Sequence, residues 1–116
     1  MKGKAEVFDL LTMESRPYES RGENVFYSAD TFKTRIIQLG PGQEMPACRM
    51  ASHVVFVALE GEANIRVEDE DLALDEGKCL VTPPATISMR TAKGVRMLGI
   101  QIHRESTRLT THVPQL

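Results

Sequence analysis

Turn-forming glycine and proline residues divide this 116-residue chain into short segments, and this spacing constrains the fold more than any other feature. The segments between the turns are apolar runs, and turns at intervals of about ten residues are typical of many short β-strands. Only 8–13 approaches a helical period, and it is too short for a capped helix. Since no helices alternate with the strands, the strands have only one another to cover their apolar faces. The sequence therefore predicts an all-β sandwich or barrel.

Alternation of side-chain polarity marks the expected strands most clearly in two places. In 62–67, apolar side chains at odd positions alternate with polar side chains at even positions, as expected for a strand with one solvated face. In 97–103, leucine and isoleucine at even positions alternate with methionine, glycine, glutamine and histidine at odd positions. We expect strands at 6–10, 25–28, 31–39, 47–50, 53–59, 62–67, 72–74, 79–82, 86–90 and 95–103.

The length of the chain suits one domain, 1–116. Within it we expect N-terminal strands and an arm in 1–30, and the barrel core in 31–103. The polar tail, 104–116, is expected to be frayed or to lie on a partner. The turns between the strands are expected at 40–42, 60–61, 68–71, 75–77, 83–85 and 92–94.

Charge and cysteine content narrow the class of protein. The formal net charge is −2, and lysine and arginine are scattered rather than clustered, which argues against a nucleic-acid partner. No apolar run has the length of a signal peptide or a membrane span, so we expect a cytoplasmic protein without a membrane partner. Cys48 and Cys79 fit neither a disulfide framework nor a CxxC zinc site, and we expect free thiols.

Two blocks of sequence carry a family resemblance. Gly42–Gly61 reads GQEMPACRMASHVVFVALEG and closes on FVALEG, and Gly77–Ser88 reads GKCLVTPPATIS, with Pro83 six residues after its glycine. In order and spacing the two blocks resemble the two signature motifs of the cupin family, and the resemblance covers 32–103. It implies a double-stranded β-helix, or jelly-roll barrel, of two antiparallel sheets with a pocket between them.

The same resemblance directs attention to four positions. Cupin pockets usually hold a divalent metal through two histidines at i and i+2, a glutamate, and a third histidine from the second motif. These positions fall on Cys48, Met50, Val54 and Ser88, so none is a histidine or a carboxylate. An isopropyl group has no lone pair, and shifting either block by one residue recovers no more than one nitrogen ligand. We therefore expect no metal and no cofactor.

An apolar substitution at most ligand positions suggests a different use of the pocket. Methionine and cysteine behave as adaptable apolar groups, and a deformable pocket suits irregular ligands. We expect a metal-free barrel without catalytic activity that binds a small, largely apolar molecule. The predicted pocket residues are Cys48, Met50, Val54, Phe56 and Ser88.

Three alternatives stay open from the sequence alone. A metal-independent isomerase or epimerase would need a general acid and base, and the candidates are Glu44, Tyr27, His53 and His103, although no spacing pairs any two of them. A soft-metal site for copper could form on Cys48 and Met50, whose i, i+2 spacing aims both sulfur atoms the same way.

An interaction role is the third alternative. The long N-terminal segment could cover an edge strand of a second copy, so we expect a homodimer.

His53 is expected to face outward, next to the missing glutamate position, and Arg90 would be a candidate for anion recognition if it pointed inward.

Overall fold

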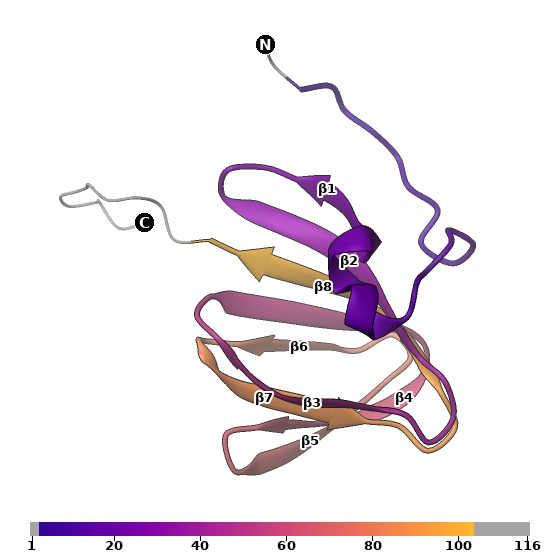
Figure 1. Cartoon of the computed structure of the whole chain (residues 1–116), viewed down its shortest axis with the longest axis vertical. Coiled ribbons are helices and arrows are strands. Elements are labelled where there is room, and N and C mark those ends of the chain that lie inside the picture. Colours follow the sequence, from indigo (N-terminus) through magenta and orange to yellow (C-terminus); the bar gives the residue numbers. More distant parts are fainter. Residues whose placement is uncertain (1–2, 104–116) are drawn as a thin grey trace, which may run out of the picture.

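The computed structural model describes residues 3–103, which form eight strands and one short 3-10 helix (Figure 1). Every strand pairing is antiparallel, which confirms the predicted all-β fold. No helix of this part of the chain is long and apolar enough to span a membrane. The elements are η1 (Tyr18–Asn24), β1 (Val25–Ser28), β2 (Phe32–Leu39), β3 (Glu44–Met50), β4 (His53–Val67), β5 (Glu70–Asp75), β6 (Cys79–Thr82), β7 (Ala85–Arg90) and β8 (Val95–Ile102).

The strands form two sheets that share β4. The first sheet has the order β1-β2-β8-β4-β6, and the second has the order β3-β7-β4-β5. The first half of β4 pairs with β8 and β6, whereas its second half pairs with β5 and β7. In Figure 1, β1, β2 and β8 lie at one end of the molecule, and β3, β5 and β7 lie at the other. The two sheets therefore face each other across a common interior.

A bend at Gly61 carries β4 from one sheet to the other. The pairing register with β8 shifts between Ala58 and Glu60, and Gly61 has a φ of 79°. A Cβ atom at this position would lie 2.1 Å from the carbonyl oxygen of Gly94. The expected turn at 60–61 between two separate strands was therefore wrong, because the chain bends there and continues as one strand, β4.

The other strand predictions differ in accuracy. The bounds of β1 and β6 match those expected, and β2 and β8 begin or end one residue inside their expected ranges. The expected strand at 6–10 is absent, and η1 was not predicted.

In the region of the missing strand, the Asp9 carboxylate accepts the N–H groups of Leu11 and Thr12, at 3.1 and 3.3 Å, which closes a turn. The pKa of Asp9 is lowered, chiefly by a side-chain hydrogen bond from Thr12.

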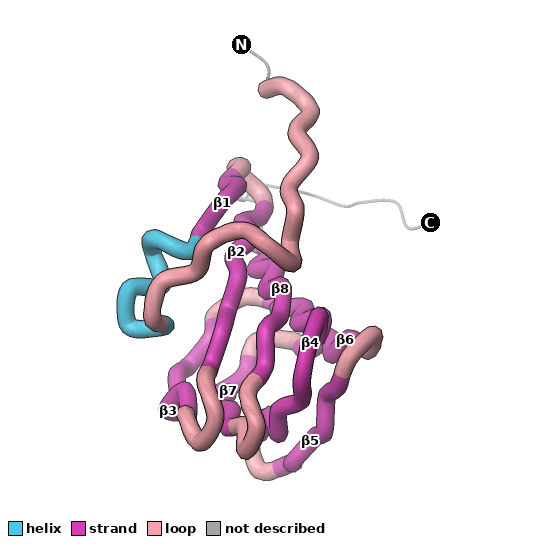
Figure 2. Tube along the Cα trace, turned by 90° about the vertical axis from the view of Figure 1, so that its right-hand side faces the viewer, coloured by secondary structure: helices cyan, strands magenta, loops and turns pink. Residues whose placement is uncertain are grey.

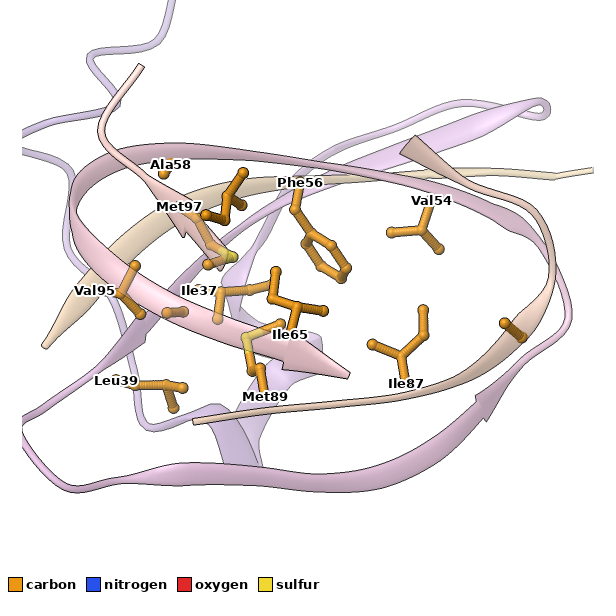
Figure 3. Close-up of a cluster of buried hydrophobic side chains, with 13 residues drawn as sticks. Ile37, Leu39, Val54, Phe56, Ala58, Ile65, Ile87, Met89, Val95 and Met97 are labelled. Carbon is orange, nitrogen blue, oxygen red and sulfur yellow. The ribbon is translucent and has the colours of Figure 1, made fainter. Parts of the chain in front are cut away.

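The core lies between the sheets (Figure 3). Odd positions face the core on β2, β7 and β8, whereas on β4 the core-facing positions change from even before Gly61 to odd after it. On β8 the inward face is the one that carries methionine and glycine, and the leucine and isoleucine side chains lie on the outer face. The largest fully buried side chains are Ile36, Leu39, Ile65, Ile87 and Met97.

Arg96 fastens the N-terminal segment to the outside of the first sheet. This arginine is only 7% exposed. Its Nε donates to the carbonyl oxygen of Leu10 at 2.9 Å, and its two terminal nitrogens donate to the carbonyl oxygen of Met13 and to the side chain of Gln38. Three hydrogen bonds from the buried guanidinium hold residues 10–13 over the end of β2 and the beginning of β8.

Because the backbone of Gly94 lies so close to Gly61, one methyl group added at position 61 should destabilise the fold strongly. We expect Gly61→Ala to lower the free energy of unfolding by about 3 kcal/mol or more, because the new Cβ collides with backbone and the positive φ adds strain. Gly77→Ala is the matched control, since Gly77 has a φ of 87° but no atom lies within 4 Å of the place that a Cβ would take. It should cost only about 1 kcal/mol. Urea unfolding of both variants gives the comparison, and equal losses would contradict the role of the bend.

Candidate functional site

A cavity lies between the two sheets at one end of the barrel. It is lined by the beginning of β4, the middle of β2, the end of β8 and parts of β3 and β7. Deeper core residues, such as Leu39, Ala58 and Met97, do not reach it. The cavity volume is about 50 Å³. A single water molecule needs about 10–15 Å³ by the same measure, so the space suits a few atoms of a ligand at a time.

Four of the five predicted pocket residues line this cavity together. Val54 and Phe56 are 2% and 4% exposed and form its apolar wall from β4 (Figure 3). Cys48 and Met50 are half-buried and reach it from β3. Their i, i+2 spacing therefore directs both sulfur-containing side chains into the same space, as strand geometry requires.

Ser88, the fifth predicted residue, does not line the cavity. On β7 the buried positions are Ala85, Ile87 and Met89, and Ser88 lies between them on the outer face. It borders a separate polar hollow on the outside of the second sheet. Ile87 takes the place expected for Ser88, and its Cα is the pairing partner of Cys48. The motif alignment was one residue out, and the apolar alternation of 85–89 was the signal that could have corrected it.

A third sulfur-containing side chain reaches the cavity through an irregularity in β3. The pairing of β3 with β7 shifts between Met45 and Cys48, so these residues, three apart, both line the cavity. A regular strand would place them on opposite faces. Pro46 lies inside this irregularity, and proline within a strand is confined to edges and bulges. That proline was the signal in the sequence for a bulge here.

Polar side chains that the sequence interpretation missed lie at the mouth of the cavity. Arg35 and Gln101 line it from β2 and β8. The Nη2 of Arg35 donates to the Oε1 of Gln101 at 3.4 Å, and the Nε2 of Gln101 donates to the Oγ of Ser52 at 3.5 Å. Arg35 has the same parity as the core residue Ile37, and this was the signal that it faces inward.

Gly99 makes room for the side chains around it. A Cβ atom on Gly99 would lie 3.1 Å from Cδ1 of Ile37, 3.6 Å from Cγ of Arg35 and 3.7 Å from Cε1 of Phe56. The absence of a side chain at this inward position lets the stem of Arg35 and the ring of Phe56 lie over β8. Gly99 therefore helps to set the shape of the cavity.

The 3-10 helix η1 borders the cavity from outside the sheets. Tyr18, at its start, and Asn24, at its end, both line the cavity. The Asn24 side chain accepts the N–H of Arg16 at 2.7 Å and donates to its carbonyl oxygen at 3.0 Å. These two bonds tie the segment before η1 to the last residue of the helix.

The side chains at the family's four ligand positions do not suit a metal of the usual cupin type. Of the positions that the resemblance assigned, Cys48, Met50 and Val54 line the cavity, and Ile87 lies beside them in place of Ser88. None of these four lining side chains presents an oxygen or nitrogen donor. Iron, manganese, nickel and zinc sites draw on imidazole and carboxylate groups. Within 3–103, no three histidine, cysteine, aspartate or glutamate side chains gather into a metal-binding group. This donor set does not fit a hard or borderline cation.

The residues considered for acid–base chemistry lie elsewhere. Glu44, Tyr27, His53 and His103 do not line the cavity. His53 is exposed, as expected for its outward parity on β4, and Arg90 is exposed at the end of β7. The tail, 104–116, lies outside the described residues.

Comparison with known proteins shows the fold. No family model matches the sequence, and no curated protein matches it. A structure from Thermus thermophilus aligns with a TM-score of 0.74 and 25% identity, covering 87% of this chain and all of that one. A cupin superfamily protein from Desulfitobacterium hafniense aligns with a TM-score of 0.69 and 15% identity, covering 90% of this chain and 95% of that one.

A third similar structure is the cupin domain of Cnp3 from Schizosaccharomyces pombe. It aligns with a TM-score of 0.63 and 15% identity, over 69% of this chain. The aligned part of the chain spans only 61% of that domain. Together the similar structures confirm the predicted fold, a double-stranded β-helix of the cupin type.

Proposed function

The chain is a small protein with the cupin fold, and we propose that it is a metal-free barrel that binds a small, largely apolar molecule. The observation that carries this proposal is the lining of the cavity. Val54, Phe56 and Ile87 form buried apolar walls, and Val54 stands at a position that the family resemblance assigns to a metal ligand. Ligand sites of this kind combine apolar walls with a few polar groups that fix orientation.

The size and composition of the cavity limit the ligand. A volume of about 50 Å³ accepts a short aliphatic group, and Met45 and Met50 at its wall can move to admit more. The polar end of such a ligand would lie at the mouth, near Gln101 and Ser52. Each buried methylene contributes about 0.8 kcal/mol, so even a short chain can bind measurably.

A series of linear alcohols from butanol to octanol tests this proposal. We expect the dissociation constant to fall about fourfold for each added methylene while the chain enters the cavity, and to level off once the cavity is full. Calorimetry, together with chemical-shift changes of the methyl groups of Val54 and Ile87, would measure the binding and locate it.

Occlusion of the cavity supplies the control. Cys48→Phe fills part of the cavity and should weaken alcohol binding at least about tenfold, whereas Ala73→Phe, on the exposed outer face of β5, should leave it unchanged. Binding that ignores chain length, or that survives Cys48→Phe at full strength, would show that the cavity is not the binding site.

The structure lends less support to a metal-independent isomerase or epimerase. Such an enzyme needs a general acid and base within hydrogen-bond reach of its substrate. The described residues that line the cavity include no carboxylate and no imidazole, and their ionisable side chains are those of Tyr18, Arg35 and Cys48. We therefore favour binding over turnover.

The three sulfur-containing side chains of β3 favour one second candidate, a site for monovalent copper. Met45, Cys48 and Met50 line the same cavity, although the sequence pattern aligned only Cys48 and Met50. Soft thiolate and thioether ligands select Cu(I), and three donors from one bulged strand suit a trigonal site. Binding would release the thiol proton of Cys48, since the thiolate is the ligand.

Anaerobic titration of the reduced protein with Cu(I), in competition with bicinchoninate, tests this candidate. We expect one ion per chain, loss of about 100-fold in affinity for Cys48→Ser, and about tenfold for Met45→Leu or Met50→Leu. Cys79→Ser is the matched control and should bind normally, because Cys79 is exposed outside the cavity. Unchanged affinity in both methionine variants would show a simple thiol adduct and remove this candidate.

A further inference from the structure

The outer face of the second sheet carries two adjoining polar hollows. Their volumes are about 230 and 340 Å³, several times that of the interior cavity. Three side chains border both hollows, namely Glu44 on β3, Asn64 on β4 and Arg90 on β7. We call the two hollows together the outer groove. It extends from β3 to β5, which lie at the two margins of the second sheet (Figure 2).

Strand pairing brings the residues of the outer groove together. The register sets four outward residues in one row across β3, β7, β4 and β5, namely Glu44, Arg90, Asn64 and Ala73. Side chains in such a row are neighbours, with Cβ atoms about 5 Å apart. Because Ala73 ends the row with only a methyl group, space stays open above β5. The 3-10 helix η1 packs on β1 and β2 of the first sheet and does not cover this face.

Hydrogen bonds hold the backbone at one end of the row. The N–H of Thr91 donates to the carbonyl oxygen of Gln43 at 3.2 Å, and its hydroxyl donates to the carbonyl oxygen of Glu62 at 2.6 Å. Thr91 is only 5% exposed. Glu44 and Arg90 each adjoin a residue of this network, and Glu62 belongs to it. The fold therefore fixes where the main chain places these three charged residues.

Two couples of opposite charge on the same face form closed ion pairs. The Nη1 of Arg66 lies 3.0 Å from both carboxylate oxygens of Asp71. The Nη1 of Arg49 lies 3.4 Å from the Oε2 of Glu68. These two arginines are therefore each paired with a carboxylate beside them on the sheet.

Arg90, Glu44 and Glu62 differ from these pairs. Glu44 and Arg90 are pairing partners, yet within residues 3–103 neither side chain makes an ion pair or a hydrogen bond. The Glu62 carboxylate, also at the groove, makes none among these residues either. Asn64 donates an N–H to Asp71 at 3.4 Å, and its carbonyl oxygen stays available as an acceptor. The outer groove thus presents one guanidinium and two carboxylates that no side chain of the described part neutralises.

We propose that the outer groove binds a basic α-amino acid, which carries one carboxylate and two cationic groups. The ligand carboxylate pairs with Arg90, whose planar guanidinium suits a bidentate contact. The α-ammonium group pairs with Glu44, which lies opposite Arg90 just as the ammonium lies beside the carboxylate in the ligand. The more distant side-chain cation pairs with Glu62, on the far side of Asn64 along β4. This site is separate from the interior cavity and does not depend on what that cavity binds.

The charges of the outer groove exclude simpler ligands on electrostatic grounds. An anion such as a phosphate ester would meet Glu44 and Glu62 beside its one cationic contact, and like charges placed together oppose binding. A diamine would leave Arg90 without a counter-ion. A neutral polar molecule would pair with none of the three charges. Only a ligand with two cations and one anion matches the groove group by group.

Titration of the full chain with L-lysine, followed by amide chemical shifts, tests the proposal. We expect shifts at Asn64, Arg90 and Thr91 and a dissociation constant on the order of millimolar at low ionic strength, because exposed ion pairs are individually weak. Added salt should weaken the binding. Norleucine lacks the side-chain cation and 1,5-diaminopentane lacks the carboxylate, and each should bind about fivefold more weakly than lysine.

Neutral variants assign each charge to its contact. Arg90→Gln should remove the preference for lysine over 1,5-diaminopentane, and Glu62→Gln should remove the preference for lysine over norleucine. Arg49→Gln is the matched control, since Arg49 lies on the same face outside the outer groove and should leave lysine binding unchanged. All three side chains are exposed, so the melting temperatures should stay close to wild type.

Several results would overturn the proposal. Lysine that moves no resonance of the outer groove at about 50 mM would do so, as would equal affinities for lysine and norleucine in the wild-type chain. Loss of binding in Arg49→Gln would show attraction to the whole charged face rather than a site. Tighter binding of glutamate or inorganic phosphate than of lysine would make the groove an anion site and would refute the proposal as well.

These outcomes are independent of the interior cavity. Alcohol binding there should be the same in Arg90→Gln, Glu62→Gln and the wild-type chain, because neither residue lines that cavity. Failure of lysine binding therefore leaves the proposal for the cavity standing, and failure of alcohol binding leaves the outer groove unaffected.

Discussion

The fold depends on the approach of Gly61 to Gly94, where two backbone segments lie too close for any side chain at Gly61. This contact allows β4 to leave the first sheet and enter the second as one continuous strand. One strand thereby fixes the relative position of both sheets. Val54 and Phe56 before the bend, and Ile65 after it, all face the same interior as a result.

The interior cavity is lined by side chains that cannot act as ligands for a hard cation. Cys48, Met50 and Val54, which the family resemblance assigned to ligand positions, line the cavity together with Ile87. Burial of Val54 and Ile87 in the cavity wall stabilises the folded state, because it removes apolar surface from water. A buried imidazole or carboxylate would instead need a hydrogen-bond partner or a countercharge. The same scaffold can thus be stabilised by apolar packing at positions that elsewhere bind metal.

Predictions that depend on regular alternation of side chains along a strand were correct. Predictions of side-chain direction failed where a bulge or an alignment error shifted that alternation by one residue. Turn spacing and two motifs predicted the all-β barrel, and strand parity placed Cys48 and Met50 together. The bulge that brings in Met45, and the one-residue error at Ser88, both changed parity, which pattern alone does not detect. The strand expected at 6–10 was wrong, because a strand requires a neighbour to pair with and alternation does not supply one.

The glycine at position 99 has a consequence for the divergence of this barrel. Because three neighbours lie within 4 Å of the place where its Cβ would be, the usable space is governed by an atom that is missing rather than by one that is present. A single-step replacement there would reshape the chamber by displacing Ile37, Arg35 or Phe56, all of which line it. The dimensions of the chamber can therefore change through a residue that has no side chain of its own.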